Sequence, residues 1–356
     1  MKMKLKKRSI KKSVWPLAAA LAAALAAGPA LAQVTLSGFV DINMEHAKSG
    51  GKSIKGLSSG GLNTSRLQFK AQEDLGGGLK VTAVHEITLK ADSGQQGSPR
   101  HTYAQIGSKD WGELSAGRRD LPSAEMYGYI DPTYSGDYSP ISNTMLYYAP
   151  WRESNSLFYT SPRIANFQAR LAATAGREDG SKDAQVRSAA LDYFAGDLYL
   201  MAAVDQQHRR DLSDPNQMRR SRDYYLGGVY SVSSALDLTF LYHRYNGYYA
   251  YPPYADFTSK GQDVQLGLRY EFNAQQRVFA SVVRKNDKLD AALSDATSWV
   301  AGYLYGFSKR TDLYAIVGAV KHARDSDMRF PVSFNHANPL SNENPRGLQL
   351  GLRHKF

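Results

Sequence analysis

The chain has 356 residues, no Cys, 23 Tyr and a formal net charge of +11 at pH 7. The lack of Cys excludes a disulfide scaffold, and the charge taken alone suggests nucleic acid or an anionic membrane as a partner. Residues 1–32, however, contain seven of the 44 basic residues and no acidic residue. Without them, 37 basic residues stand against 33 acidic ones, a net charge of +4. The rest of the chain is therefore only mildly basic, and we expect no nucleic-acid partner.

Residues 1–32 have the pattern of a secretory signal peptide. A basic start is followed by an apolar run from Val14 to Gly28 and by the small-residue sequence Ala30-Leu31-Ala32. The run of about fifteen residues is shorter than the roughly twenty that a spanning helix needs. We expect residues 1–32 to be cleaved after export through the Sec pathway, and residues 33–356 to form one domain.

From residue 33 onward, apolar and polar side chains alternate in segments of about ten residues. The alternation is clear in residues 34–45, 66–72, 81–89 and 263–271. A period of two with one apolar and one polar face is typical of β-strands. The chain is therefore expected to be all-β.

Short turns and long polar loops separate these strands in regular succession. The short turns are DLGGG, DWG, Ser161-Pro162-Arg163, FAGD, SVSSA, FNAQQ and SKRTD. The long loops are near residues 47–60, 90–100, 119–153, 176–185, 208–221, 247–260, 286–295 and 323–345. These fifteen connections predict sixteen strands.

A soluble sandwich would show the same alternation, but three features favour a membrane barrel. The short-turn and long-loop asymmetry persists from end to end, and aromatic residues gather near strand ends. Many positions on the polar face carry full charges, which suits a water-filled lumen: Arg66, Lys70, Lys80, Glu86, Arg170, Asp192, Arg269 and Glu271. A closed barrel also leaves no unpaired strand edge in lipid. We predict a 16-stranded antiparallel transmembrane β-barrel.

The segment 119–153 differs from the other loops in length and composition. It joins two predicted strands, and it is rich in Tyr, Pro, Gly, Ser and Asp, with charges of both signs. Loops this long inside an ordered domain are usually functional. We predict that this third long loop folds into the barrel and narrows it; the alternative is a surface-exposed insertion.

Several stretches along the mature chain resemble the general Gram-negative porins, in their beta-proteobacterial branch. They are VTLSGFVD, SRLQFKAQEDLGGGLK, the GR of LSAGRRD, RESNSLFYTSP, SKRTDLYA and the terminal GLRHKF. The resemblance implies a homotrimeric barrel in the outer membrane, in contact with lipid and lipopolysaccharide. It further implies that wall arginines face acidic groups on the third loop, and that the barrel-insertion machinery reads Phe356.

By this resemblance, Arg66, Arg118 and Arg152 form the basic side of a pore constriction, with Asp131 and Asp137 on the loop opposite. To these we add Lys80 and Glu86, which share the lumen face of one strand by alternation. Two features depart from the family pattern. The stretch DPTYSGD replaces the acidic loop tip of enteric relatives, and Phe39 stands where some relatives have a pore-facing Lys.

Strict alternation conflicts with the resemblance at Arg118, because it would place this side chain outward with Leu114 and Ala116. We therefore expect a twist or bulge at Gly117.

The leading hypothesis is a porin for passive diffusion of small anionic or neutral hydrophilic solutes, with an anion preference and neither cofactor, metal nor catalytic residues. A second is a selective channel for small organic or aromatic acids, because the loop is rich in tyrosine: Tyr127, Tyr129, Tyr134, Tyr138, Tyr147 and Tyr148. A third, an outer-membrane hydrolase, needs a Ser/His or Asp/His constellation, and the sequence offers no convincing candidate.

Overall fold

The structure is a computed structural model. It describes residues 33–177, 182–214, 216–251, 255–289, 295–323, 330–333, 335 and 343–356. The predicted signal peptide, residues 1–32, lies outside the described residues. Within the described ranges, no helix has the length and apolar character needed to cross a membrane.

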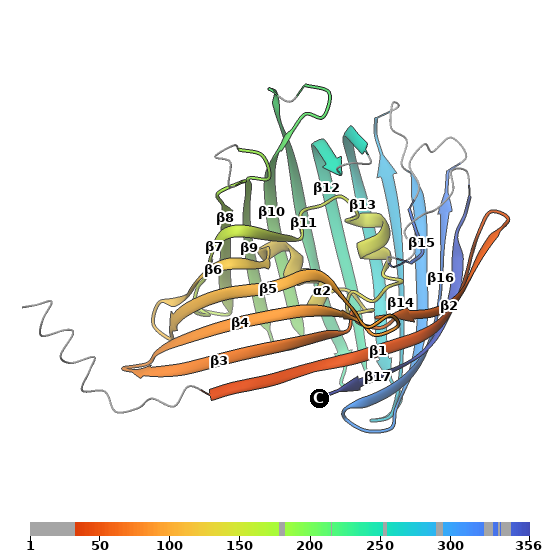
Figure 1. Ribbon diagram of the computed structural model, residues 1–356, viewed down its shortest axis with the longest axis horizontal. Helices are drawn as coiled ribbons and strands as arrows, with labels where there is room; N and C mark the ends of the chain where they lie inside the picture. Colours follow the sequence, from red (N-terminus) through yellow and green to blue (C-terminus); the bar gives the residue numbers. More distant parts are fainter. Residues whose placement is uncertain are drawn as a thin grey trace, which may run out of the picture.

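The described chain forms one antiparallel sheet of seventeen strands that closes on itself (Figure 1). The strands are β1 (Gln33–Ser49), β2 (Lys52–Ser59), β3 (Arg66–Gly76), β4 (Leu79–Lys90), β5 (Gln95–Ser108), β6 (Gly112–Asp120), β7 (Arg152–Thr160), β8 (Phe167–Thr174), β9 (Val186–Ala195), β10 (Leu198–Arg210), β11 (Met218–Ser233), β12 (Leu236–Tyr251), β13 (Ala255–Glu271), β14 (Gln276–Asp287), β15 (Ala296–Gly306), β16 (Thr311–His322) and β17 (Arg346–Lys355).

Strand β1 closes the barrel by pairing along both of its edges. On one edge it pairs with β17, and the main chains of Gly38 and Phe356 exchange hydrogen bonds of 3.1 and 3.0 Å. On the other edge its first half pairs with β3 and its second half with β2. Strands β2 and β3 therefore share one position in the wall, and the seventeen segments make the sixteen-stranded barrel that the sequence predicts.

Some loops are shorter than expected from the sequence. Residues 47–60 form a β-hairpin with β2, because Gly50 and Gly51 adopt positive φ values of 41° and 35° and allow a tight turn. Strands β11, β12 and β13 have 16, 16 and 17 residues and extend into the loops expected near 208–221 and 247–260. The composition there is polar, but the ladder continues, for example between Asn246 and Lys260.

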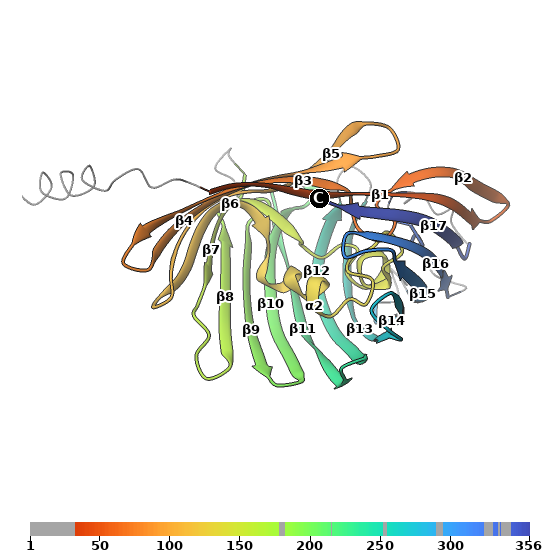
Figure 2. The ribbon, with the colours of Figure 1, turned by 90° about the horizontal axis from the view of Figure 1, so that it is seen from below.

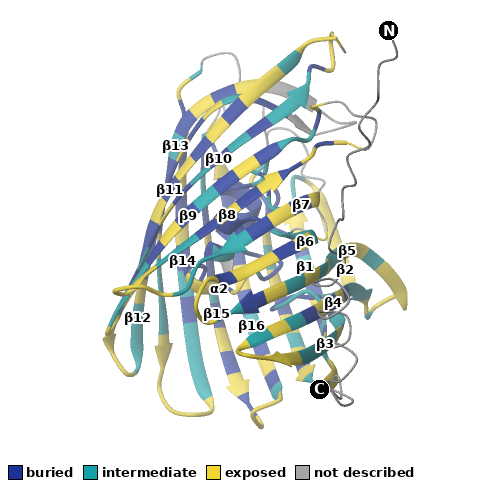
Figure 3. Ribbon diagram, turned by 90° about the vertical axis from the view of Figure 1, so that its left-hand side faces the viewer, coloured by how far each residue is buried: buried dark blue, intermediate teal, exposed yellow. Residues whose placement is uncertain are grey.

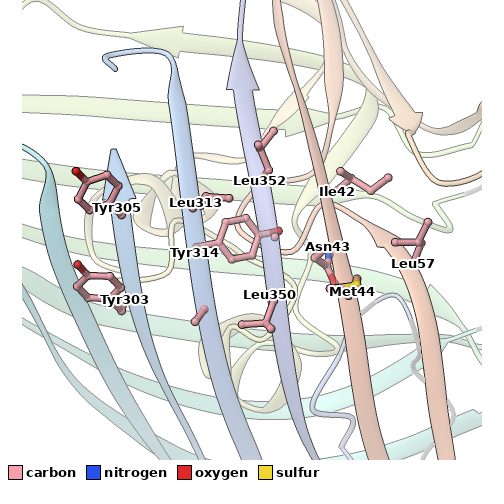
Figure 4. Close-up of a pocket in the computed structure, with 12 residues that line it drawn as sticks. Ile42, Asn43, Met44, Leu57, Tyr303, Tyr305, Leu313, Tyr314, Leu350 and Leu352 are labelled. Atoms are coloured by element: carbon pink, nitrogen blue, oxygen red, sulfur yellow. The ribbon is translucent and has the colours of Figure 1, made fainter. Parts of the chain in front are cut away.

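Exposed and buried residues alternate along the strands (Figure 3). The outer face is apolar, as shown by Val34, Leu36 and Phe69, which are 69%, 55% and 45% exposed. The inner face is polar and buried. A shallow hollow of about 520 Å³ on the outer face is lined by residues of β1, β2 and β15 to β17, among them Ile42, Met44, Leu57, Tyr303, Tyr305, Leu313, Leu350 and Leu352 (Figure 4).

The third long loop, residues 121–151, folds into the barrel as predicted. It contains the short helical turns η1 (Pro122–Glu125), α2 (Met126–Tyr129) and η2 (Ile141–Met145), and α2 lies inside the curve of the wall (Figures 1 and 2). The loop buries an apolar side against wall residues of β7 and β9 to β12, in a cluster that includes Leu121, Ile130, Ile141, Met145, Met201, Tyr225 and Leu241. This apolar contact explains why the loop turns inward.

Candidate pore constriction

The wall formed by β3 to β7 carries a basic cluster beside the base of the inward loop. Arg66 begins β3, Arg100 lies in β5, Arg118 in β6 and Arg152 begins β7. The sheet register brings these ends together, since Arg118 is opposite Thr102 and Arg152 is opposite Asp120. The cluster thus forms where four strands end near the entry and exit of the inward loop.

Glu86 of β4 is the buried acid of this cluster, with an exposed fraction of 3%. Arg66 Nη1 lies 3.6 Å from its Oε1, and Arg100 Nε also contacts Oε1. Gln68 Nε2 donates to the other carboxylate oxygen at 2.9 Å. A buried carboxylate is tolerated when it is paired and hydrogen-bonded in this way.

Asp120 is the second acid. Its Oδ1 lies 2.6 Å from Arg152 Nε, and its Oδ2 lies 3.1 Å from His101 Nε2. His101 Nδ1 is in turn 3.9 Å from Glu86, so the two carboxylates belong to one connected network. With Arg118 included, four arginines stand against two carboxylates. The network therefore has a net charge of about +2 when His101 is neutral.

Arg118 occupies the irregularity that the sequence predicts at Gly117. The register between β6 and β7 shifts between Gly117 and Arg119, and Gly117 has a φ of 135°. Arg118 donates from Nη1 to Ser154 Oγ at 2.9 Å and to the carbonyl of Arg152 at 3.4 Å. These bonds connect it to the basic cluster. Among described residues, no carboxylate lies within ion-pair distance of its guanidinium.

A neighbouring set of side chains neutralises Glu125, an acid of the inward loop. Arg119 Nη2 lies 3.8 Å from Glu125 Oε1, and Arg170 Nη1 contacts Glu125 Oε2. Arg170 also donates two hydrogen bonds, of 2.7 and 2.6 Å, to Asp192. The Arg119 guanidinium rests 5.1 Å from the centre of the Tyr103 ring. This set has two cations and two anions and adds no net charge.

Asp131 is fully buried inside the loop rather than placed in the opening. Its exposed fraction is 0%. Its Oδ1 accepts hydrogen bonds from the Thr133 amide at 2.9 Å and hydroxyl at 2.8 Å, and Ser139 donates to Oδ2. Burial raises the pKa of this carboxyl. The expected position across from the arginines is therefore not the one found, because neighbouring hydroxyls draw the side chain into the loop.

Asp137 is likewise a buried anchor, with an exposed fraction of 5%. Ser333 Oγ, the Asn335 amide and Gln349 Nε2 donate hydrogen bonds to it at 2.7, 2.8 and 2.6 Å. Burial and the nearby carboxylate of Glu45 raise its pKa. Asp137 thus ties the loop to β17 and the last long loop, away from the arginines.

Lys80 lies outside the constriction as well. It is exposed beside the β3–β4 turn, where it pairs across the ladder with Asp74. Glu86 lies six positions further along β4, or about 20 Å away at ~3.3 Å per residue. Of the residues expected in the constriction, Arg66, Arg118, Arg152 and Glu86 come together, whereas Lys80, Asp131 and Asp137 lie elsewhere.

The side of the loop that remains exposed is aromatic. Tyr129 and Tyr134 are 48% and 42% exposed. The Arg269 guanidinium lies 4.6 Å from the Tyr134 ring centre, and its Nη2 donates to the carbonyls of Tyr129 and Asp131 at 2.7 and 2.8 Å. Among the three acidic residues of the loop, only Glu125 keeps part of its side chain, 32%, in contact with solvent.

Four members of the site were missed by sequence reasoning. Arg100 and His101 lie at the edge of a segment expected to be loop, whereas β5 begins at Gln95. The sequence places Asp120 within the loop 119–153, whereas the structure places it at the end of β6. Arg119 shares the inner face with Ser115, to which it donates at 3.2 Å, so the alternation around Gly117 could have identified it.

Comparison with known proteins agrees with this architecture. A family model described as "Gram-negative porin" matches residues 18–325. The chain belongs to this family. The porin is 26% identical to an outer membrane porin of Bordetella pertussis over 396 residues, which cover 96% of this chain and 99% of the relative. It is also 26% identical to outer membrane porin protein 32 of Delftia acidovorans over 374 residues, with 98% and 100% coverage.

Solved structures share the fold of this porin. The anion-selective porin from Comamonas acidovorans matches with a TM-score of 0.78 and 23% identity, covering 91% of this chain and 100% of that one. The OmpF porin of Salmonella typhi, in complex with daunomycin, matches with a TM-score of 0.66 and 18% identity, covering 91% and 98%. The porin is therefore an outer-membrane β-barrel channel protein.

In the part of this porin that the structure describes, no group of three or more His, Asp and Glu side chains has the geometry to hold a metal ion.

Proposed function

We propose that this porin conducts small hydrophilic solutes and ions by passive diffusion and prefers anions. The observation that carries the proposal is that the basic side chains at the constriction keep a net positive charge, while two of the loop acids are buried. The basic cluster retains a net charge of about +2 by the count given above, whereas Asp131 and Asp137 are 0% and 5% exposed and bound within the protein. The printed name of the Comamonas acidovorans structure, an anion-selective porin, supports the same direction.

The electrostatics favour such a preference. Fixed charges around a narrow pore set ion preference because low-dielectric walls strengthen their field. The Debye length is about 8 to 10 Å at ordinary salt. Screening should therefore weaken the preference at high salt while leaving it strong at low salt.

Solute flux into liposomes tests this function. Three solutes of similar size are compared: a monocarboxylate, an uncharged polyol and a monoamine. We expect the carboxylate to enter fastest and the amine slowest at low salt. The entry rates of the three solutes should become more similar as salt is added. Entry of the amine ahead of the carboxylate would contradict the anion preference.

A second candidate, a channel selective for small aromatic acids, is favoured by one observation. Tyr129 and Tyr134 are exposed aromatic residues in the described part of the inward loop, and Arg66, Arg100 and Arg152 lie on the wall at the base of the same loop. An aromatic carboxylate would stack on a ring while an arginine binds its charge. Block of the ion current by benzoate, but not by an aliphatic carboxylate of equal charge, would support this candidate; equal block would exclude it.

We also propose the assembly route of this porin. Residues 1–32 direct export through the Sec pathway and are removed, Phe356 is read by the barrel-insertion machinery, and three copies form a homotrimer. One support for the trimer is a related solved structure of OmpT from Vibrio cholerae, which is described as a trimer form and matches with a TM-score of 0.65. Native mass spectrometry of the purified protein tests the trimer; a monomer under non-denaturing conditions would contradict it.

A further inference from the structure

A β-bulge in the wall aims a histidine at the pore constriction. The register of β4 and β5 shifts between His85 and Ile87, so that Glu86 alone is opposite two residues of β5, Arg100 and His101. An extra residue in one strand interrupts the strict alternation of side chains and changes their direction. The bulge therefore explains why two consecutive residues, Arg100 and His101, both lie beside Glu86.

Both ring nitrogens of His101 face carboxylates. Nε2 lies 3.1 Å from Asp120 Oδ2, and Nδ1 lies 3.9 Å from Glu86 Oε1. Among described residues, none donates a hydrogen bond to either nitrogen. A neutral imidazole carries a proton on only one nitrogen, so the lone pair of the other nitrogen is directed at an anion. The imidazolium would direct an N–H toward each carboxylate.

The charges around the ring act in both directions. The two carboxylates favour the imidazolium, whereas the neighbouring arginines oppose it. The charged and titratable side chains of the strands around His101 are Arg66 of β3, Glu86 of β4, Arg100 and Tyr103 of β5, Arg118, Arg119 and Asp120 of β6, and Arg152 of β7. The side chain of His101 is 21% exposed, so it can exchange protons with water.

Protonation of His101 changes the charge of the constriction. With a neutral ring, four arginines and two carboxylates give a net charge of about +2; with the imidazolium, five cations and two carboxylates give about +3. Histidine ordinarily changes charge between about pH 5 and 8. Carboxylic acids ordinarily do so near about pH 4, and arginine stays charged throughout. Within the range of histidine, the net charge of this network is therefore set by His101.

We propose that His101 determines how strongly the constriction prefers anions, and that its protonation strengthens the preference as the pH falls. The added charge lies among the arginines, where low-dielectric walls strengthen its action on a permeating ion. The inference rests on the proposed function, because it concerns the selectivity of the same constriction.

Reversal potentials of open single channels in a KCl gradient test the proposal at about pH 8 and about pH 5.5. They are read at the open level, so that closing events of the inward loop do not contribute. H101Q keeps the charge that the constriction has with a neutral histidine, and H101R supplies a permanent cation. The control H85Q removes an exposed histidine from the outer face of the same wall.

We expect the anion-to-cation permeability ratio of the wild type to rise about fivefold at low salt between the two pH values, because one unit charge is added at about 8 Å from the ion. H101Q should keep the lower ratio and H101R the higher ratio at both pH values. H85Q should follow the wild type. The single-channel conductance of H101Q at the higher pH should equal that of the wild type, which shows that the variant has folded.

A wild-type ratio that stays constant or falls on acidification would overturn the proposal without any variant. An equal change with pH in H101Q would also overturn it, because other groups would then be titrating. A channel that prefers cations at both pH values, but shifts toward anions on acidification only when His101 is present, would contradict the proposed anion preference and support the role of His101. The two proposals therefore fail separately.

Discussion

Asp120 Oδ1 lies 2.6 Å from Arg152 Nε, directly across the β6–β7 ladder and at the two ends of the inward loop. One step further, the amide of Leu121 donates to the carbonyl of Trp151 at 2.8 Å. The pair therefore fastens the base of the loop and also sets the charge of the constriction. Asp120 lowers the net positive charge that Arg152 contributes.

The first prediction follows from this pair. Asp120→Asn should strengthen the anion preference, because it removes one of the two carboxylates of the basic cluster. One unit charge at about 8 Å in water changes the energy of a monovalent ion by ~0.5 kcal/mol, in opposite directions for an anion and a cation, so the anion-to-cation permeability ratio should change about fivefold. Reversal potentials of planar bilayers measure the change. A shift toward cations would contradict the assignment.

Arg66→Ala tests the basic side of the constriction. The ratio of anion to cation permeability should fall by about twofold or more, since the remaining arginines no longer outweigh Glu86 and Asp120 as strongly. The matched control is Lys80→Ala, which removes the same charge near a turn about 20 Å away along β4. If both variants shift the ratio equally, the effect is one of overall charge and the site is not where we place it.

Asp131→Ala should disturb the loop more than the selectivity. The variant removes an acceptor that is bound by Thr133 and Ser139, and leaving buried donors unsatisfied costs about 1–3 kcal/mol. We expect more frequent closing events in single-channel records and a smaller shift of the reversal potential than in Asp120→Asn. A large shift of the reversal potential toward anion selectivity, without more frequent closing events, would place Asp131 in the pore opening.

The anchor at Asp137 predicts a pH dependence. Burial and Glu45 raise the pKa of Asp137, so the anchored loop favours the protonated carboxyl. The stabilisation is complete below the unfolded pKa, about 4, and is lost as the pH rises through the raised value in the folded protein. Channel closing should therefore become more frequent with rising pH, and Asp137→Asn should remove this dependence. Closing that increases on acidification and persists in the variant would contradict the argument.

Deleting Phe356 should reduce insertion into the outer membrane severalfold. The deletion removes the residue whose main chain pairs with Gly38 at the barrel seam and which is 45% exposed. Secretion and signal cleavage should continue as in the wild type. The amount of trimer in outer-membrane fractions measures the effect, with Phe356→Tyr as the aromatic control; a normal yield in the deletion strain would contradict it.

Much of the fold could be predicted from the sequence because the period-two alternation and the turn asymmetry extend over the whole mature chain. The inward loop was also predictable from its length, and the bulge at Gly117 from a conflict between alternation and resemblance. The positions of the loop acids Asp131 and Asp137 could not be predicted from the sequence. Whether Asp131 points into the pore or to Thr133 and Ser139 depends on loop geometry, and Asp137 bonds to Gln349, 212 positions later in the chain.

The boundaries of the strands also could not be predicted from the sequence. Arg100 belongs to the site because β5 begins five residues earlier, at Gln95, in a stretch that reads as polar loop. For a residue this close to a strand boundary, pairing with the neighbouring strand decides whether it belongs to the strand, and the local sequence does not show this pairing.

The anion preference is tested most directly by the reversal potential of the wild-type channel in a planar bilayer with a KCl gradient. We expect the sign of an anion-selective pore, with a reversal potential that is larger at low salt and smaller at high salt, because four arginines outweigh Glu86 and Asp120 at the constriction. A potential of the cation-selective sign at low salt would contradict it, since Glu86, Asp120 and Glu125 would then dominate the pore.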